Sequence, residues 1–370
     1  MAEADCDWGV PPWRIDVAVP RAPRPVRADV AIVGAGFTGL ATALACARHF
    51  ASVHVFESGA VGAGASGRTG GIALEGTAAG PLPGADACLD ALAALVREHA
   101  IECDLALPGC WIVRHAQGPA APTAPCWPDA DATWLVRERV EPGGALDPGK
   151  LVAGLASAAL RAGVAIHEHA RADAVLPGAP PRLAIGDRSV AADRIVLATN
   201  AFLPRFVPDA GIRPALTLAL ASAPLARATL EEIALGAMPF YTSDLPYLWG
   251  RATQSGRLVI GAGLAFDDAG RVERVAIGRA DVQDVLARVA ARIRGLHPAL
   301  REVEITHAWG GPIAFREGGV PVLAEIAPGV AATGACAGHG VALSAAIAEL
   351  LARWAGEGAA LPAWGAVGGR

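Results

Sequence analysis

A glycine-rich turn is the first segment of the chain whose residue types indicate chemistry. Gly34, Gly36 and Gly39 occur in the spacing G-x-G-x-x-G, after a β-branched run that predicts a strand over 29–33 and before a helical stretch over 40–50. Small residues allow the backbone to approach a pyrophosphate, and the amino end of a helix faces that charge. The turn therefore predicts a site for a dinucleotide.

An acid and a second small-residue loop extend this prediction. Glu57 stands at the end of the next expected strand, 53–56, where a carboxylate can accept ribose hydroxyls. The loop at 62–71 follows, with Ser66 and Arg68 framed by glycines. Such a loop allows close approach by a large planar group such as the flavin ring, which favours FAD over NAD. A flexible linker is the alternative interpretation of this loop.

The order of these motifs along the chain resembles that of a known family. The turn and Glu57 are followed by the loop at 64–71, by Leu-Ala-Thr-Asn-Ala at 197–201, by Trp-Gly-Gly at 309–311 and by Gly-His-Gly-Val at 338–341. This series is similar to FAD-dependent oxidoreductases of the D-amino-acid oxidase superfamily. Within it, the chain most resembles the gamma-glutamylputrescine oxidase and glycine/sarcosine oxidase branch.

The resemblance implies FAD contacts along the whole cofactor. Relatives that bind flavin covalently use a cysteine nearer Trp309, and no cysteine lies there, so we expect non-covalent FAD. The residues carried over to FAD binding are Gly34, Gly36, Phe37, Thr38, Gly39, Glu57, Ser58, Gly64, Ala65, Ser66, Arg68, Thr69, Gly70, Gly71, Ala172, Ala198, Thr199, Asn200, Gly310, Gly338, His339, Gly340 and Val341.

A third glycine loop has a physical reason to lie at the flavin. Gly338, His339 and Gly340 open a helix expected from Val341 to Arg353, which directs free N–H groups and a positive dipole end at a ligand. Reduced flavin carries negative charge, which such a helix stabilises. An ordinary helix start with an exposed His339 is the alternative.

Four side chains are candidates to contact the substrate: His339, Trp309, Tyr247 and Arg251. Tyr247, Trp249 and Arg251 alternate along an expected strand and so share a face. The resemblance implies that this sheet covers the flavin, so the face would supply an aromatic wall and an anion partner. The alternative is a stripe used for structural packing at the solvent side.

The chain departs from the family at several substrate positions. Ile313 aligns with the arginine that clamps a substrate carboxylate in glycine and D-amino-acid oxidases, which makes a simple amino acid bound in that manner doubtful. Pro312 and Gly318 replace an arginine and an aspartate of the putrescine-type branch. Cys336 replaces an aromatic residue, and we interpret it as a small apolar filler rather than a reactive thiol.

The resemblance implies oxidation of an amine or amino-acid-like C–N bond to an imine by hydride transfer to FAD. The electrons would pass to oxygen or to another acceptor. Lys150, the single lysine, lies at the start of an expected helix, far from the ring. Either His339 or an arginine then supplies the positive charge for oxygen, or the enzyme is a slow oxidase that passes its electrons to another acceptor. A flavin-binding protein without turnover and a nicotinamide-dependent dehydrogenase are the alternatives.

The elements that position these residues predict an α/β fold. We expect a discontinuous Rossmann-like FAD-binding domain and an antiparallel-sheet substrate domain. His167 and His169 flank a strand and are expected at the surface, with no third ligand for a metal. The expected boundaries are 1–25 for an N-terminal arm, 26–80, 145–211 and 305–370 for the FAD-binding domain, and 81–144 and 212–304 for the substrate domain.

Composition excludes several functional classes. The 370 residues are 53% hydrophobic and 18% charged, with a net charge of −5 and no dense arginine tract, so we expect no nucleic-acid partner. Apolar runs are too short to span a membrane. The acidic first residues do not resemble a secretory signal, so a cytoplasmic location is expected. The cysteines are dispersed and form no Cys-x-x-Cys pair, so we expect no metal site. The sequence does not decide whether the chain forms a homo-oligomer.

Overall fold

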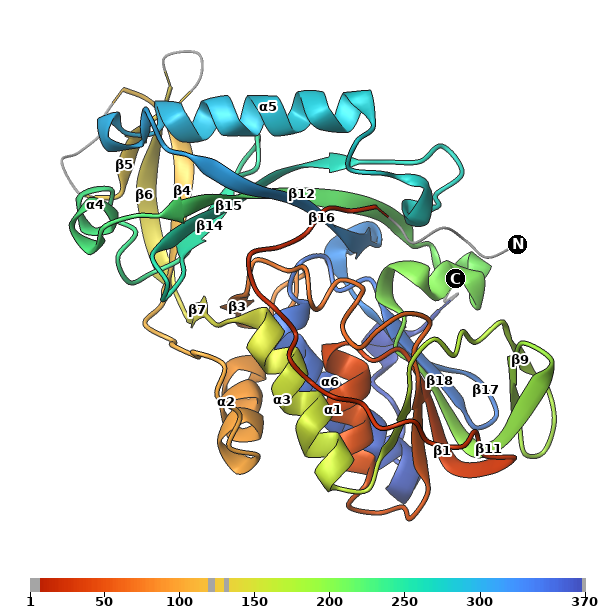
Figure 1. The fold of residues 1–370 in the computed structure, drawn as a ribbon. Coiled ribbons are helices and arrows are strands. Elements are labelled where there is room, and N and C mark those ends of the chain that lie inside the picture. Colours follow the sequence, from red (N-terminus) through yellow and green to blue (C-terminus); the bar gives the residue numbers. More distant parts are fainter. Residues whose placement is uncertain (1–6, 119–123, 130–132, 368–370) are drawn as a thin grey trace.

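The computed structural model describes residues 7–118, 124–129 and 133–367, whose strands form two large sheets (Figure 1). The first sheet contains β1 (Arg27–Val33), β2 (Val53–Phe56), β8 (Ala165–His167), β9 (Ala174–Leu176), β10 (Arg182–Ile185), β11 (Arg188–Leu197), β17 (Val322–Ala327) and β18 (Val330–Gly334). Its main order is β17-β18-β11-β1-β2-β8, and the pairs from β18 to β8 are all parallel. The α/β fold class predicted from the sequence is confirmed.

Helices pack beside this sheet because their small and apolar residues allow close approach. They are α1 (Phe37–Cys46), α2 (Cys88–Glu98), α3 (Pro148–Arg161) and α6 (Gly340–Glu357). α1 packs against both α3 and α6, and nearly all of its residues are buried. Asp147 caps α3 by accepting the Lys150 N–H at 2.9 Å, with Pro148 in the first turn.

The second sheet has the order β16-β12-β15-β14-β13-β4-β6-β5. Its strands are β4 (Cys110–Gln117), β5 (Cys126–Pro128), β6 (Thr133–Glu141), β12 (Arg213–Pro224), β13 (Phe240–Thr242), β14 (Trp249–Ala252), β15 (Arg257–Ala265) and β16 (Ile305–Phe315). Neighbours pair antiparallel, except for the parallel pair β13 and β4. α5 (Ala280–Gly295) covers one face of this sheet, α4 (Arg227–Glu232) lies at its edge, and β3 (Ile72–Leu74) pairs separately with β7 (Gly143–Ala145) (Figure 1).

Two segments differ from the sequence-based expectation. We expected residues 305–315 in the third segment of the FAD-binding domain, but β16 pairs along its length with β12 in the second sheet. The partner strand lies about ninety residues earlier, and such a pairing has no local signal. β6 was not predicted, because its outer half is charged and exposed and does not alternate.

His167 is buried in the first sheet, so its expected surface position is wrong. Its side chain is 5% exposed and stacks on Phe56, with ring centroids 4.9 Å apart. His54 on the neighbouring strand lies 3.0 Å from it, Nδ1 to Nε2. Burial, His54 and Arg24 lower the pKa of His167 to about 4, so the imidazole stays neutral near pH 7.

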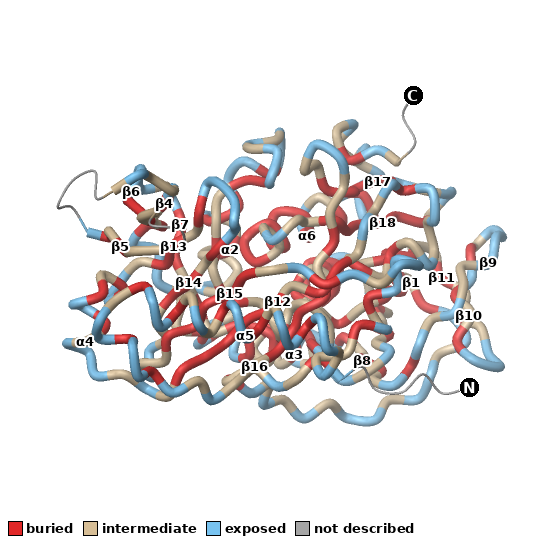
Figure 2. The backbone as a smooth tube through the Cα atoms, turned by 90° about the horizontal axis from the view of Figure 1, so that it is seen from above, coloured by how far each residue is buried: buried red, intermediate tan, exposed pale blue. Residues whose placement is uncertain are grey.

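Buried residues (red in Figure 2) concentrate along the central strands of both sheets and on α6, while exposed residues gather on the outer turns. Within the described residues, no helix combines the length and apolar character needed to cross a membrane. The loops that follow β1, β11 and β18 therefore lie between two packed layers, and this is where the candidate site forms.

Candidate active site

The glycine turn after β1 is closed by contacts that leave no room for side chains. Gly34 has φ +105°, and a Cβ added there would lie 2.7 Å from the Ala198 carbonyl oxygen. A Cβ on Gly39 would lie 1.9 Å from the Gly34 oxygen. Helix α1 can therefore begin directly at the end of β1, with its first N–H groups facing outward.

Ser66 connects the second small-residue loop to this turn. Its hydroxyl accepts the Phe37 N–H at 2.9 Å, and a Cβ on Gly36 would lie 2.7 Å from the same oxygen. The amino end of α1 and the loop at 62–71 thus form one continuous surface. Both motifs were predicted, but their direct contact was not.

Glu57 is held in place at the end of β2. Its Oε2 accepts the Ala35 N–H at 2.8 Å, and its Oε1 accepts the Gly59 N–H at 2.9 Å and the Ser58 hydroxyl at 3.1 Å. Oε2 keeps lone-pair capacity for a further donor. The carboxylate is therefore oriented beside the amino end of α1, as a ribose-binding acid requires.

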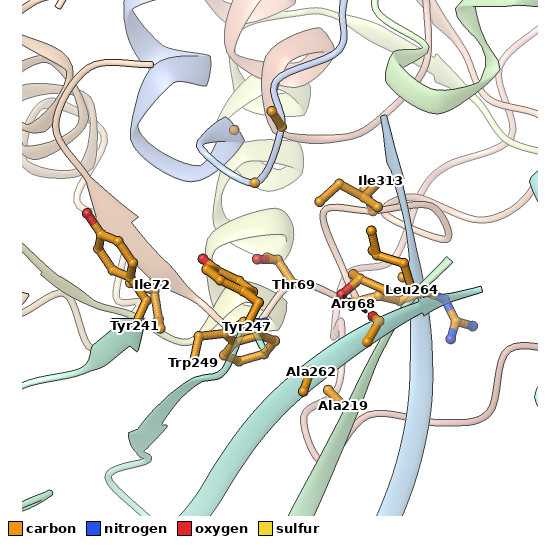
Figure 3. Close-up of a pocket in the computed structure, with 18 of the residues that line it drawn as sticks. Arg68, Thr69, Ile72, Ala219, Tyr241, Tyr247, Trp249, Ala262, Leu264 and Ile313 are labelled. Carbon is orange, nitrogen blue, oxygen red and sulfur yellow. Dashed lines mark hydrogen bonds between the residues drawn. The ribbon is translucent and has the colours of Figure 1, made fainter. Parts of the chain in front are cut away.

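A cavity of about 1700 Å³ lies between these loops and the second sheet (Figure 3). Fifteen of the sequence-predicted residues line it: Gly36, Phe37, Thr38, Ala65, Ser66, Arg68, Thr69, Gly70, Ala198, Asn200, Tyr247, Trp309, Gly338, Gly340 and Val341. The others lie outside its lining: Gly34, Gly39, Glu57, Ser58, Gly64, Gly71, Ala172, Thr199, Arg251, Gly310 and His339.

The cavity has features that fit a dinucleotide cofactor. The Thr199 hydroxyl is buried and has no hydrogen-bond partner within the described residues. The amino ends of two helices, α1 and α6, contribute Gly36, Phe37, Gly340 and Val341 to the lining. Unsatisfied helix N–H groups together with an orphaned hydroxyl suit a ligand that carries phosphates and polar ring atoms.

His339 precedes α6 but its side chain is not part of the cavity lining. Burial lowers its pKa, while a contact from Nδ1 to the Ala337 oxygen at 3.4 Å opposes that shift. The imidazole is therefore neutral near pH 7. The positive end at this side of the cavity comes from the helix backbone rather than from a histidine cation.

The N-terminal arm supports the second loop from behind. The Trp13 indole N–H donates to the Gly67 oxygen at 2.7 Å, and the Trp309 indole N–H donates to the Arg68 oxygen at 2.9 Å. The two indoles meet edge to face, with centroids 5.4 Å apart. Arg68 itself turns toward the arm and donates to the Gly9 oxygen at 2.7 Å, away from the tyrosines in Figure 3.

Gly310 also faces the arm and not the cavity. Its N–H donates to the Trp8 oxygen at 2.7 Å, and its carbonyl lies 3.3 Å from Arg68. The next residue, Gly311, lines the cavity instead. Successive residues of a strand point to opposite sides, which is consistent with Gly311 and not Gly310 lining the cavity.

Arg251 does not supply an anion partner to the cavity, contrary to the sequence interpretation. It is 4% exposed, its Nε donates to the Gly70 oxygen, and its guanidinium lies over the Trp13 ring at 5.9 Å. Burial lowers its pKa to about 10, which still leaves it charged. Arg251 therefore supports the loop together with the arm.

Trp249 and Tyr247 line the cavity from different structural elements. β14 begins at Trp249, so Tyr247 comes from the preceding loop and does not share a strand face with Trp249. A Cβ on Gly70 would lie 2.1 Å from Trp249 Cζ3, and a Cβ on Gly261 would lie 2.0 Å from Cζ2. The Trp249 indole thus occupies space that both glycines leave open.

An ionic network fixes the loop that carries Tyr247. Arg292 donates to both oxygens of Asp129, one of them at 2.8 Å from Nε, and to the carbonyls of Pro246 and Tyr247 at 3.2 and 3.4 Å. His115 lies 3.0 Å from Asp129. The Asp129 side chain is only 2% exposed, so this network is well shielded from solvent.

Sequence reasoning missed other lining residues. Tyr241 donates its hydroxyl to Glu141 Oε2 at 2.9 Å and lines the cavity next to Tyr247. The only local signal was that these are the two tyrosines of the chain. Cys336 and Ile313, which the sequence did place at substrate positions, also line the cavity. Burial raises the pKa of the Cys336 thiol to about 12, which keeps it protonated.

Comparisons with known proteins agree with this geometry. Residues 29–354 match the family model of FAD-dependent oxidoreductases, called DAO. The chain is 27% identical to the probable oxidoreductase OrdL of Rhizobium meliloti (strain 1021), over 91% of this chain and 85% of that protein. It is 25% identical to the probable oxidoreductase OrdL of Haemophilus influenzae, over 88% and 82% of the two chains.

Solved structures share the fold. L-proline dehydrogenase from P. horikoshii has a TM-score of 0.71 at 16% identity, covering 92% of this chain and 96% of that one. Glycine oxidase from Geobacillus kaustophilus has a TM-score of 0.67 at 21% identity, covering 89% and 94%. These likenesses concern the arrangement of the chain.

Proposed function

The chain belongs to the DAO family of FAD-dependent oxidoreductases, and we propose that it oxidises the C–N bond of an amine or amine-bearing substrate to an imine. One observation carries the proposal: the glycine loops and an aromatic wall enclose a single cavity of about 1700 Å³. That space accommodates the ring end of a flavin together with a small substrate.

The chain's own residues support FAD binding along the path that the sequence predicted. We assign the adenosine ribose to Glu57, the pyrophosphate to the amino end of α1 with Ser66, and the ring to the loop at 68–71 and the amino end of α6. When bound, FAD accepts the hydride that leaves the carbon next to the substrate nitrogen.

The protein's part in the reaction is to orient, to shield and to stabilise charge. Apolar side chains such as Ile72, Leu264 and Ile313 line the cavity and exclude water from the reacting carbon. The backbone dipole of α6 stabilises negative charge that develops beside Gly340. Ile313 offers no cation to a carboxylate, which favours an amine over glycine as substrate.

A dehydrogenase that passes electrons to an acceptor other than oxygen is the favoured form of this activity. Lys150, the chain's single lysine, donates to both oxygens of Asp104 at 2.9 and 2.8 Å, and it is not part of the cavity lining. His339 is neutral because burial lowers its pKa. Neither side chain then supplies a positive charge for oxygen reduction.

Anaerobic reduction of the purified holoenzyme tests the proposal. Amines, N-alkyl amino acids and simple amino acids are added without oxygen, and loss of the flavin absorption band is followed. We expect bleaching by amines. A yellow protein that no amine or amino acid bleaches would overturn the proposal in favour of flavin binding without turnover.

A further inference from the structure

Three aromatic side chains form a wall at one end of the cavity. Tyr241 and Trp249 are directly paired across β13 and β14, and Tyr247 joins them from the connecting loop (Figure 3). Directly paired residues place their side chains on one face of a sheet. The face of an aromatic ring carries negative potential, which attracts cations.

The hydrogen bond that Tyr241 donates determines whether its phenolic oxygen can act as a donor or an acceptor toward a ligand. A phenol has one proton, and Tyr241 donates it to Glu141 Oε2 at 2.9 Å. Burial and the Glu141 carboxylate raise the pKa of Tyr241, so the proton stays in place. The phenolic oxygen can therefore only accept a hydrogen bond from a ligand, and it suits an N–H donor and repels a carboxylate.

Glu141 is held by Arg139 behind this wall. Arg139 Nε and Nη2 donate to Oε1 at 2.8 and 2.6 Å, which leaves Oε2 to Tyr241. Glu141 is not itself part of the cavity lining. Its negative charge polarises the phenol without a direct contact to the ligand, and so strengthens the phenolic oxygen as an acceptor.

Three of the four arginines that line the cavity donate to other groups of the chain. Arg68 donates to the Gly9 oxygen, Arg292 to Asp129, and Arg316 to the Ala366 oxygen at 2.8 Å. Arg288 lies exposed on α5. At the wall itself, a carboxylate would face the lone pairs of the Tyr241 oxygen, whereas an N–H cation would find an acceptor there.

We propose that Tyr241, Tyr247 and Trp249 bind a second, cationic amino group of the substrate, apart from the nitrogen whose C–N bond is oxidised. The proposal rests on the proposed amine oxidation and narrows its substrate class to diamines and similar amines with a distal N–H cation. Tyr247 contributes a ring and a hydroxyl that has no hydrogen-bond partner within the described residues.

Matched substrate pairs test this assignment in the holoenzyme. Linear alkanediamines are compared with monoalkylamines of equal carbon number by steady-state kinetics with a dye acceptor. We expect a KM about 10-fold lower for the diamine, in line with the energies of cation–π contacts. Tyr241→Phe and Glu141→Gln should raise the diamine KM more than the monoamine KM and so remove most of that difference.

Glu138→Gln is the matched control. Glu138 lies on the same strand and also pairs with Arg139, but it contacts Ser243 at 2.8 Å and not Tyr241. Removal of its charge should leave the diamine preference unchanged. Equal effects of Tyr241→Phe on both amines, no effect on either, or an equal loss of preference in the control would overturn the proposal.

A binding measurement separates this proposal from the proposed activity. tert-Butylammonium, an N–H cation whose carbon next to nitrogen has no hydrogen and so cannot be oxidised in this way, is titrated against the oxidised holoenzyme, and the flavin absorption and tryptophan fluorescence are followed. Saturable binding that Tyr241→Phe weakens about 10-fold supports the cation site even if no amine bleaches the flavin. Absence of binding, or tighter binding of butyrate, refutes it.

Discussion

Gly70 must lack a side chain because of its neighbour Trp249, and not only because of a ligand. Trp249 fills the space where its Cβ would stand, and the Gly70 carbonyl accepts from Arg251. The sequence pattern marked Gly70 as part of a cofactor loop. The structure adds that the same position sets the distance between that loop and the aromatic wall.

Gly70→Ala should therefore displace the Trp249 indole and disturb the loop. A Cβ at 2.1 Å from Cζ3 is not tolerated, so we expect FAD affinity to fall at least 10-fold, measured by fluorescence titration of the apoprotein. The double variant Gly70→Ala, Trp249→Leu removes the clash and should recover part of that loss. Unchanged affinity in the single variant would contradict this account.

His167 makes stability depend on pH below neutrality. Its pKa is about 4 in the folded chain and near 6.5 when unfolded, so the unfolded chain binds more protons between these values. The free energy of unfolding should be largest above pH 6.5 and should fall as pH drops toward 4, by up to about 3 kcal/mol. Denaturant unfolding at several pH values measures this.

His167→Phe, which keeps a ring against Phe56, should flatten that dependence. His54 stays in the variant, and burial also lowers its pKa, so part of the slope remains. A variant that keeps the full slope between pH 6.5 and 4 would assign the effect to other groups.

At the scale of elements, the arm is part of the loop's support and not a loose appendage. The arm contributes Trp8 and Trp13 to the back of β16 and of the second loop, and both indoles are nearly buried. From the sequence, only the bounds of an N-terminal arm, residues 1–25, were predicted. Its partners lie on strands far along the chain, which local sequence patterns do not reveal.

Trp13→Ala should weaken both the fold and the cofactor site. Loss of a buried indole costs about 3–5 kcal/mol in unfolding free energy, and the loop also loses the donor to the Gly67 oxygen. We expect FAD to dissociate about 10-fold more readily, by dialysis and fluorescence. Trp13→Phe keeps a ring but not the N–H, so an effect of the Ala variant alone would assign the support to packing.

The motifs that bind phosphate were predictable because they are local. A strand, a glycine turn and a helix in sequence determine the first β-α-β unit, and Glu57 follows at the next strand end. The contents of the cavity were less predictable. Tyr241 meets Glu141 across 100 positions, and Arg251 turns behind its strand, since a side chain's final direction depends on tertiary partners.

At the scale of the whole molecule, the placement of charge bears on the electron acceptor. The single lysine is paired with Asp104 at half exposure, and the histidine that begins α6 is neutral. The reduced enzyme should thus be reoxidised faster by a dye than by oxygen in stopped-flow measurements. Lys150→Gln should not alter either rate, and rapid reoxidation by air would refute this arrangement.

The loop at 62–71 lies between the cavity on one side and the arm on the other, so the two sides share one set of backbone groups. Anything that orders the loop from the cavity must also favour the docked arm, by thermodynamic reciprocity. Docking of the first described residues on the loop and binding of the cofactor then favour each other. The arm should be released most readily in the apoprotein.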